Sequence, residues 1–158
     1  MSSPAAVLVC VLAMLGRNEK NTVPVEFVHV RLPHIAENVE AFASRTEGRI
    51  YLLTYTPIFR AAQRGELEAL KKVASIYVHE EWHVRHGGDE RAAYEAQLIT
   101  LTMLGSGPGS GLYGAVKKSM LQVMKNAPGT RASTALLIAQ TSGQDITAQS
   151  ASGHEVAA

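Results

Sequence analysis

Hydrophobic positions in the first third of the chain follow the pattern of two strands separated by a short helix. Val25 to Leu32 and Arg49 to Tyr55 are rich in β-branched and aromatic residues, and a proline follows closely after each run, so both segments predict strands. Between them, residues 35–42 carry apolar side chains at helical spacing (Ile35, Val39 and Phe42), which predicts a short helix. Glu47-Gly48 then predicts a turn into the second strand.

The middle of the chain changes to the period of amphipathic helices. Thr56 is a suitable N-cap for a short helix that starts at Pro57, and Gly65 separates this helix from a longer one, Glu66 to about His86. The longer helix has an apolar stripe formed by Leu67, Leu70, Ala74 and Tyr77. Gly87-Gly88 is expected to end it.

A second long helix follows at once. Asp89 is a good N-cap, and the helical pattern runs to Leu104. The two long helices are therefore expected to fold back as an antiparallel hairpin. The segment Gly105 to Gly111 lacks the Lys-Ser/Thr ending of a phosphate-binding loop, so it predicts a linker.

The C-terminal part predicts two shorter helices and a tail. The helices fit Ala115 to Lys125 and Arg131 to Gln140, and the polar segment from Ser142 onward predicts disorder. A chain of 158 residues usually supports one core. We therefore expect a single domain over residues 1–141, followed by a disordered tail over residues 142–158.

The chain opens with a 12-residue apolar run, Ala5 to Gly16. A membrane-spanning helix needs about 20 apolar residues, so this run predicts no membrane span. Its length suits either a buried first helix or a remnant export signal, although no Lys or Arg precedes it. We expect the buried helix and a cytoplasmic protein; the protein would be exported if the run is a signal segment.

Composition narrows the chemistry further. Hydrophobic residues make up 46% of the chain and charged residues 18%, which is typical of a globular protein. The formal net charge of +1 gives no field that would gather nucleic acid, so a nucleic-acid partner is not expected. Cys10 is the only cysteine, so a metal would have to be bound by His, Asp or Glu.

One motif carries specific chemistry: His79-Glu80-Glu81-Trp82-His83, a His-Glu-x-x-His pattern within the first long helix. Residues four apart share a helical face, so both imidazoles can bind one Zn²⁺ ion at about 2.0–2.1 Å. Glu80 is rotated away from the pair and can act as general base toward a metal-activated water. Glu81 and Arg85 can form an ion pair on another face of the helix.

The stretch from Ile50 to Leu104 resembles the zincin metallopeptidases, in particular the gluzincin branch. The matching residues are His79, Glu80 and His83, followed by Glu90-Arg91-Ala92-Ala93-Tyr94, which is similar to the Glu-x-x-Ala-Asp/Asn/Tyr segment of such families. The resemblance implies that Glu90 is the third zinc ligand. It also implies a His or Tyr that hydrogen-bonds the developing oxyanion, for which Tyr94 and His86 are candidates and Tyr94 is preferred.

Two other acidic residues remain open as the third ligand. Asp89 falls six residues after His83, where the metzincin branch places its third ligand, and Glu95 also follows closely. In a tight hairpin, a residue in the first turn of the second helix comes level with the last turns of the first, which favours Glu90.

The sequence therefore predicts an α+β, mainly helical zincin-like domain, with a small sheet packed on the active-site helix. The expected function is that of a zinc-dependent hydrolase, a metallopeptidase acting on a peptide or protein substrate. The strand Arg49 to Tyr55 is expected to be the edge strand that binds an extended substrate by β-augmentation. The alternative is a non-catalytic binding or regulatory protein that keeps the zincin scaffold.

Overall fold

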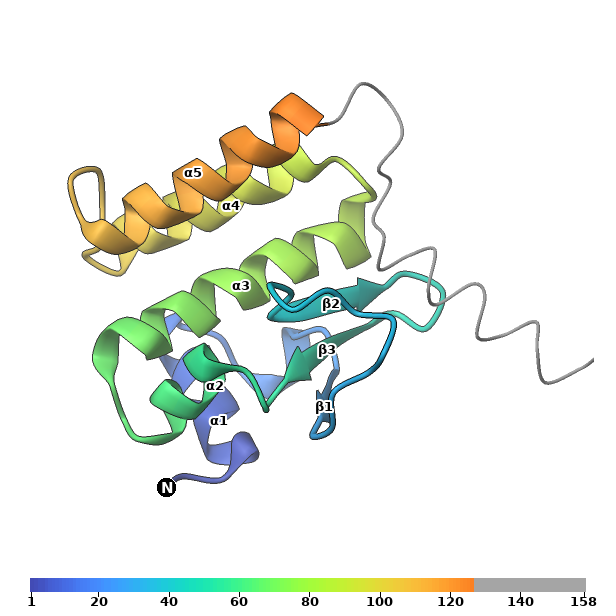
Figure 1. The fold of residues 1–158 in the computed structure, drawn as a ribbon. Coiled ribbons are helices and arrows are strands. Elements are labelled where there is room, and N and C mark those ends of the chain that lie inside the picture. The colour runs from blue at the N-terminus through green and yellow to red at the C-terminus, as the bar shows by residue number, and fades with distance from the viewer. Residues whose placement is uncertain (127–158) are drawn as a thin grey trace, which may run out of the picture.

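The computed structural model describes residues 1–126, and within them the chain forms a mainly helical α+β fold (Figure 1). This fold class agrees with the expectation from the sequence. The helices are α1 (Pro4–Met14), α2 (Pro57–Gln63), α3 (Leu67–His86), α4 (Glu90–Met103) and α5 (Gly111–Asn126), with a 3₁₀ turn η1 (Glu19–Asn21). The strands are β1 (Val25–Val28), β2 (Ala41–Ser44) and β3 (Arg49–Leu53).

The sheet has the order β1-β3-β2. Strand β3 pairs in parallel with β1 and antiparallel with β2, so the predicted strand at Arg49 to Tyr55 is central and not at the edge. Strands β2 and β3 form a hairpin closed by residues 45–48, in which Gly48 takes a positive φ of 65°. The edge strand on that side of the sheet is β2.

The helix predicted over residues 35–42 is wrong. Residues 41–44 form β2 instead, and Phe42 pairs with Tyr51 of β3, with the two rings stacked at a centroid separation of 4.8 Å. The apolar spacing of this segment is compatible with a helix, but pairing with β3 overrides that local preference. The first predicted strand is also shorter than expected, because β1 ends at Val28 and Val30 is exposed.

Helix α3 occupies the middle of the molecule (Figure 1). The sheet, α1 and α2 contact it, and on another side it packs against α4, which carries α5. The expected caps are present: Thr56 Oγ1 accepts a hydrogen bond from the Phe59 backbone, and Asp89 caps α4. Leu67, expected in the buried stripe of α3, is exposed because it is the first residue of the helix.

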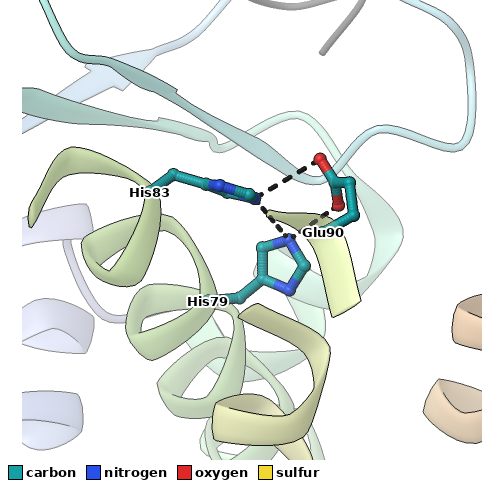
Figure 2. A group of neighbouring side chains, drawn as sticks. All are labelled: His79, His83 and Glu90. Carbon is teal, nitrogen blue, oxygen red and sulfur yellow. Dashed lines mark hydrogen bonds and ion pairs between the residues drawn. The ribbon is translucent and has the colours of Figure 1, made fainter. Parts of the chain in front are cut away.

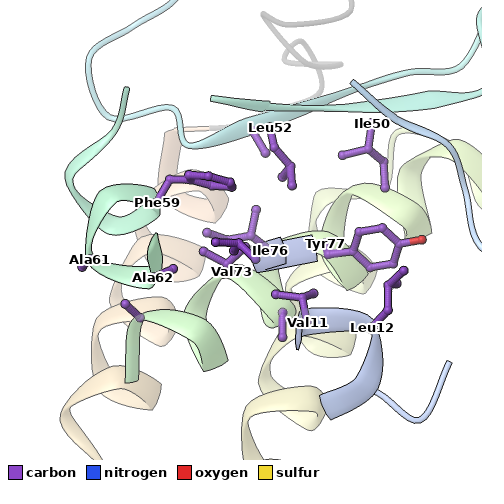
Figure 3. Packing of buried hydrophobic residues seen from close by; sticks show 14 of the residues in the cluster. Val11, Leu12, Ile50, Leu52, Phe59, Ala61, Ala62, Val73, Ile76 and Tyr77 are labelled. Atoms are coloured by element: carbon purple, nitrogen blue, oxygen red, sulfur yellow. The ribbon is translucent and has the colours of Figure 1, made fainter. Parts of the chain in front are cut away.

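The main core forms where α1, α2, α3 and the sheet meet (Figure 3). Tyr77 of α3 is fully buried there, and its hydroxyl accepts a 3.1 Å hydrogen bond from the backbone N–H of Val23. Helix α1 contributes Val7, Val11 and Leu12, so the apolar opening run is part of this core. Within residues 1–126, no helix has both the length and the apolarity that a membrane crossing requires.

Helix α5 begins four residues before the predicted start, at Gly111, and packs on α4 around Leu98, Leu101 and Val116. Gly105 ends α4 with a positive φ of 82°. The helix predicted over Arg131 to Gln140 and the tail predicted from Ser142 lie outside the described residues.

Candidate metal centre

Two histidines from consecutive turns of α3 converge on one point (Figure 2). His79 and His83 are both buried, and their Nε2 atoms lie 3.2 Å apart. The imidazoles can meet in this way because residues four apart share a face of an α-helix. The spacing of the motif therefore places two nitrogen donors side by side.

Glu90 completes the group from the first turn of α4. Its Oε2 lies 3.5 Å from His79 Nε2, and its Oε1 lies 3.4 Å from His83 Nε2. With bonds of about 2.0–2.1 Å, two ligand atoms of a tetrahedral zinc site lie about 3.3 Å apart. The observed separations match that value, so the three side chains could bind one tetrahedral ion without a change of backbone.

The other two acidic candidates lie in different surroundings. The carboxylate of Asp89 caps α4 by accepting a 3.2 Å hydrogen bond from the backbone N–H of Ala92. Glu95 forms an exposed ion pair with Arg91, at 3.3 Å. Among the described residues, the group that could hold an ion contains Glu90 and neither of these two.

The hydrogen bonds of the histidines define which ring nitrogens face the site. His83 Nδ1 lies 2.7 Å from the carbonyl oxygen of Gly87, and because a carbonyl only accepts, Nδ1 must carry the proton. In neutral His83, Nε2 then presents a lone pair toward His79 and Glu90. Metal-binding histidines commonly donate their second nitrogen to a backbone carbonyl in this way.

His79 is positioned mainly by packing. Its ring lies edge-on to the Tyr94 ring, with a centroid separation of 4.6 Å. Its Nδ1 is buried and has no hydrogen-bond partner among the described residues. Tyr94 therefore supports the imidazole that approaches Glu90 and His83.

The charges at the site favour an ionised Glu90. Burial acts to raise the pKa of its carboxyl, but hydrogen bonds from the Nε2–H groups that His79 and His83 carry when they are protonated outweigh that effect and lower the pKa to about 2. Burial and the carboxylates of Glu90, Glu80 and Glu40 raise the pKa of Tyr94 to about 12. Near neutral pH Glu90 is thus a carboxylate and Tyr94 a neutral phenol.

Glu80 lies beside the three potential ligands but does not belong to their group. Its carboxylate accepts a hydrogen bond from the backbone N–H of Ala43 on β2. Burial raises the pKa of this carboxyl above its usual range, whereas His79 and His83 act in the opposite direction. Glu80 therefore connects the edge strand with the two histidines.

The side of β2 that faces away from β3 offers backbone hydrogen-bonding groups. The backbone N–H of Leu53 donates to the carbonyl of Glu40, at 3.2 Å, so this pair is directly hydrogen-bonded. In an antiparallel ladder such pairs alternate, and the register then turns the N–H and C=O groups of Ala41 and Ala43 away from β3. The hydrogen bond from Ala43 to Glu80 agrees with this direction.

A cleft of about 750 Å³ borders the three potential ligands and Glu80. Strand β2 lines it, together with α3, the start of α4 and α5. Sequence reasoning missed the residues that β2 and α5 supply, which are Ala41, Phe42, Ala43, Val116, Ser119, Gln122, Val123 and Asn126. The turn signal at Glu47-Gly48, just before a strong strand, is the feature that could have indicated the β2–β3 hairpin.

His86, the other histidine near the motif, does not belong to the group of potential metal ligands. The His86 ring lies 4.9 Å from the ring of Trp82, and its Nδ1 is 3.2 Å from the Trp82 carbonyl. His86 lines a different cavity, beside Arg17 and Arg85. The structure thus separates His86 from His79 and His83, although all three belong to α3.

Comparisons with protein-family models, with curated proteins and with solved structures find no match to this chain. A functional assignment must therefore rest on the residues of the site and their geometry.

Proposed function

We propose that this protein is a zinc-dependent hydrolase that cleaves peptide bonds. The observation that carries the proposal is the spacing of the three donor groups, at 3.2–3.5 Å, next to a carboxylate that does not belong to their set. His79, His83 and Glu90 are the proposed zinc ligands. This donor set of two imidazoles and one carboxylate is typical of catalytic zinc, because three protein ligands leave a position for water or substrate.

Glu80 is the proposed general base. A zinc ion in this position would lower the pKa of a bound water toward 7 and polarise a substrate carbonyl. Glu80 lines the same cleft as the three proposed ligands. Its carboxylate would take the proton of the attacking water. Tyr94, which packs against His79, is the proposed donor to the developing oxyanion.

Strand β2 supports a peptide as the substrate. The backbone groups of Ala41 and the carbonyl of Ala43 face away from β3 and could pair with an extended chain as an additional strand, whereas the N–H of Ala43 already donates to Glu80. Ala43 also contacts Glu80, so a peptide bound along this edge would pass close to the general base. The sequence predicted Arg49 to Tyr55 as the edge strand that binds the substrate. Because β3 is central, we propose β2 as the strand that binds it.

The test combines zinc binding with hydrolysis. We expect native mass spectrometry of the zinc-loaded protein to show one ion per chain. Glu80→Gln should retain the ion, because Glu80 is not a proposed ligand, and should lower peptide hydrolysis by about 100-fold or more. Glu95→Gln is the matched control, since it makes the same change at an exposed position of α4 and should leave both properties unchanged.

Each outcome has a distinct meaning. A chain that takes up no zinc would contradict the metal site itself. Zinc uptake without hydrolysis of any peptide in a diverse mixture would contradict the peptidase and favour the non-catalytic binding protein. Unchanged hydrolysis by Glu80→Gln would exclude Glu80 as the base.

A further inference from the structure

Arg45 lies at one end of the cleft, directly after β2. Its side chain is exposed and lies over Gly87, at the end of α3. The guanidinium Cζ and Nη1 are each 3.6 Å from the position that a Cβ would take on Gly87. Gly87 in turn accepts the hydrogen bond of His83, so Arg45 is separated from a proposed zinc ligand by one residue.

The charge of Arg45 is not balanced by an ion pair within residues 1–126. Six other arginines do form ion pairs with carboxylates there: Arg17, Arg31, Arg49, Arg64, Arg85 and Arg91. The carboxylates of the cleft have other partners. Glu40 pairs with Lys72 at 2.9 Å, Glu90 with the histidines, and Glu80 accepts from Ala43. The cleft therefore presents a guanidinium available for an anionic group.

The position of Arg45 along the edge relates it to the proposed reaction. Arg45 is two residues beyond Ala43, the residue that contacts Glu80. An extended chain advances about 3.3 Å per residue, so a peptide lying along β2 would reach the end of the strand, where the turn residue Arg45 follows, about two residues from the position opposite Ala43. We infer that Arg45 binds a carboxylate of the substrate, about two residues from the bond that is cleaved. The inference rests on the proposed function and adds a preference for an acidic group.

Two sources could supply this carboxylate: an Asp or Glu side chain, or the C-terminus of a short peptide. Either one can form a bidentate pair with a guanidinium. The probes are fluorescein-labelled hexapeptides in which one Asp is moved along a neutral sequence, each matched with an Asn peptide. The same neutral sequence is also made with a free or an amidated C-terminus.

Binding is measured by fluorescence anisotropy on the zinc-loaded full chain carrying Glu80→Gln, which avoids turnover. At low salt we expect an acidic peptide to bind about tenfold more tightly than its neutral match. Adding Arg45→Gln should reduce this ratio below about twofold, and Arg45→Lys should restore part of it. Arg60→Gln is the matched control, because Arg60 is an exposed arginine of α2 outside the cleft.

The inference is overturned if acidic and neutral peptides bind equally, if no acidic peptide binds measurably, or if the preference survives Arg45→Gln. A merely structural contact of Arg45 with the end of α3 would change affinity for all peptides alike and leave the ratio unchanged. Hydrolysis by the wild-type protein is measured separately. Peptide cleavage without acidic preference would refute only the role of Arg45, and acidic preference without cleavage would refute only the peptidase.

Discussion

Two faces of α3 carry buried charged or ionisable groups, and the protein satisfies them in different ways. On one face, Glu81 is buried and pairs with Arg17 and with Arg85, the latter at 3.0 Å. On the other face, His79 and His83 direct their Nε2 atoms at each other and at Glu90. The first cluster contains one acid and two permanent cations, whereas the second gathers groups that can all donate an electron pair.

The difference separates a structural cluster from a candidate site. Arg17 also lies over the Tyr77 ring, 5.7 Å from its centroid, and Arg85 donates to the carbonyl of Asn21. The Glu81 cluster therefore connects the segment after α1 to α3. The histidine cluster instead borders the cleft. Its three side chains could hold a cation, and for that reason the proposed metal is placed on this face.

The largest effect is expected when a proposed ligand is removed. His79→Ala and Glu90→Ala should each lower zinc affinity by more than about 100-fold, because even partners outside the ligand set commonly contribute 10–100-fold. His86→Ala is the control on the same helix and should leave affinity unchanged. Competition with a chromogenic chelator measures all three. Equal losses for His79→Ala and His86→Ala would mean that α3 responds as a whole and would refute the distinction between its faces.

A substitution on the other face of α3 is expected to have a smaller effect, which lowers stability and leaves zinc affinity unchanged. Glu81→Ala should lower the free energy of unfolding by about 1–3 kcal/mol; a fully buried pair would give more, but Arg17 and Arg85 are partly exposed to solvent. Urea denaturation of the zinc-free protein measures this change.

Glu95→Ala provides a matched comparison, because Glu95 forms an exposed pair with Arg91 at the same four-residue spacing. It should cost less than about 0.5 kcal/mol. The zinc content of both variants should equal that of the wild type. Loss of zinc from a folded Glu81→Ala protein would contradict the independence of the two faces.

Local sequence signals were sufficient to predict the helices that carry the proposed ligands. Thr56, Gly65 and Gly87-Gly88 mark helix boundaries that the structure reproduces closely, and Asp89 caps α4 as expected. These boundaries determine which residue of α4 faces the end of α3. The four-residue spacing of the histidines places both on one face of α3. The helix boundaries then bring Glu90 beside that face.

The cleft could not be derived in the same way, because long-range contacts define its walls. Whether residues 41–44 form a helix or a strand depends on pairing with β3, which the spacing of Val39 and Phe42 does not reveal. The part of the cleft wall that α5 supplies depends on how the loop after Gly105 turns the chain back onto α4. No feature of the sequence indicated that Arg45 lies at the cleft, because its position there depends on the approach of β2 to Gly87.

Apart from the Glu95 control, the smallest effect concerns Asp89, which is adjacent to a proposed ligand but has a different role. Asp89→Ala removes the hydrogen bond to the backbone N–H of Ala92 and should lower the free energy of unfolding by about 0.5–2 kcal/mol. Zinc affinity should change little, because the backbone of α4 still places Glu90 beside the histidines. Asp89→Asn keeps a capping oxygen and should recover most of the stability. Urea denaturation and chelator competition on the same samples separate the two properties. If Asp89→Ala loses zinc and Glu90→Ala retains it, the ligand is Asp89, and α4 must begin differently in the metal-bound protein.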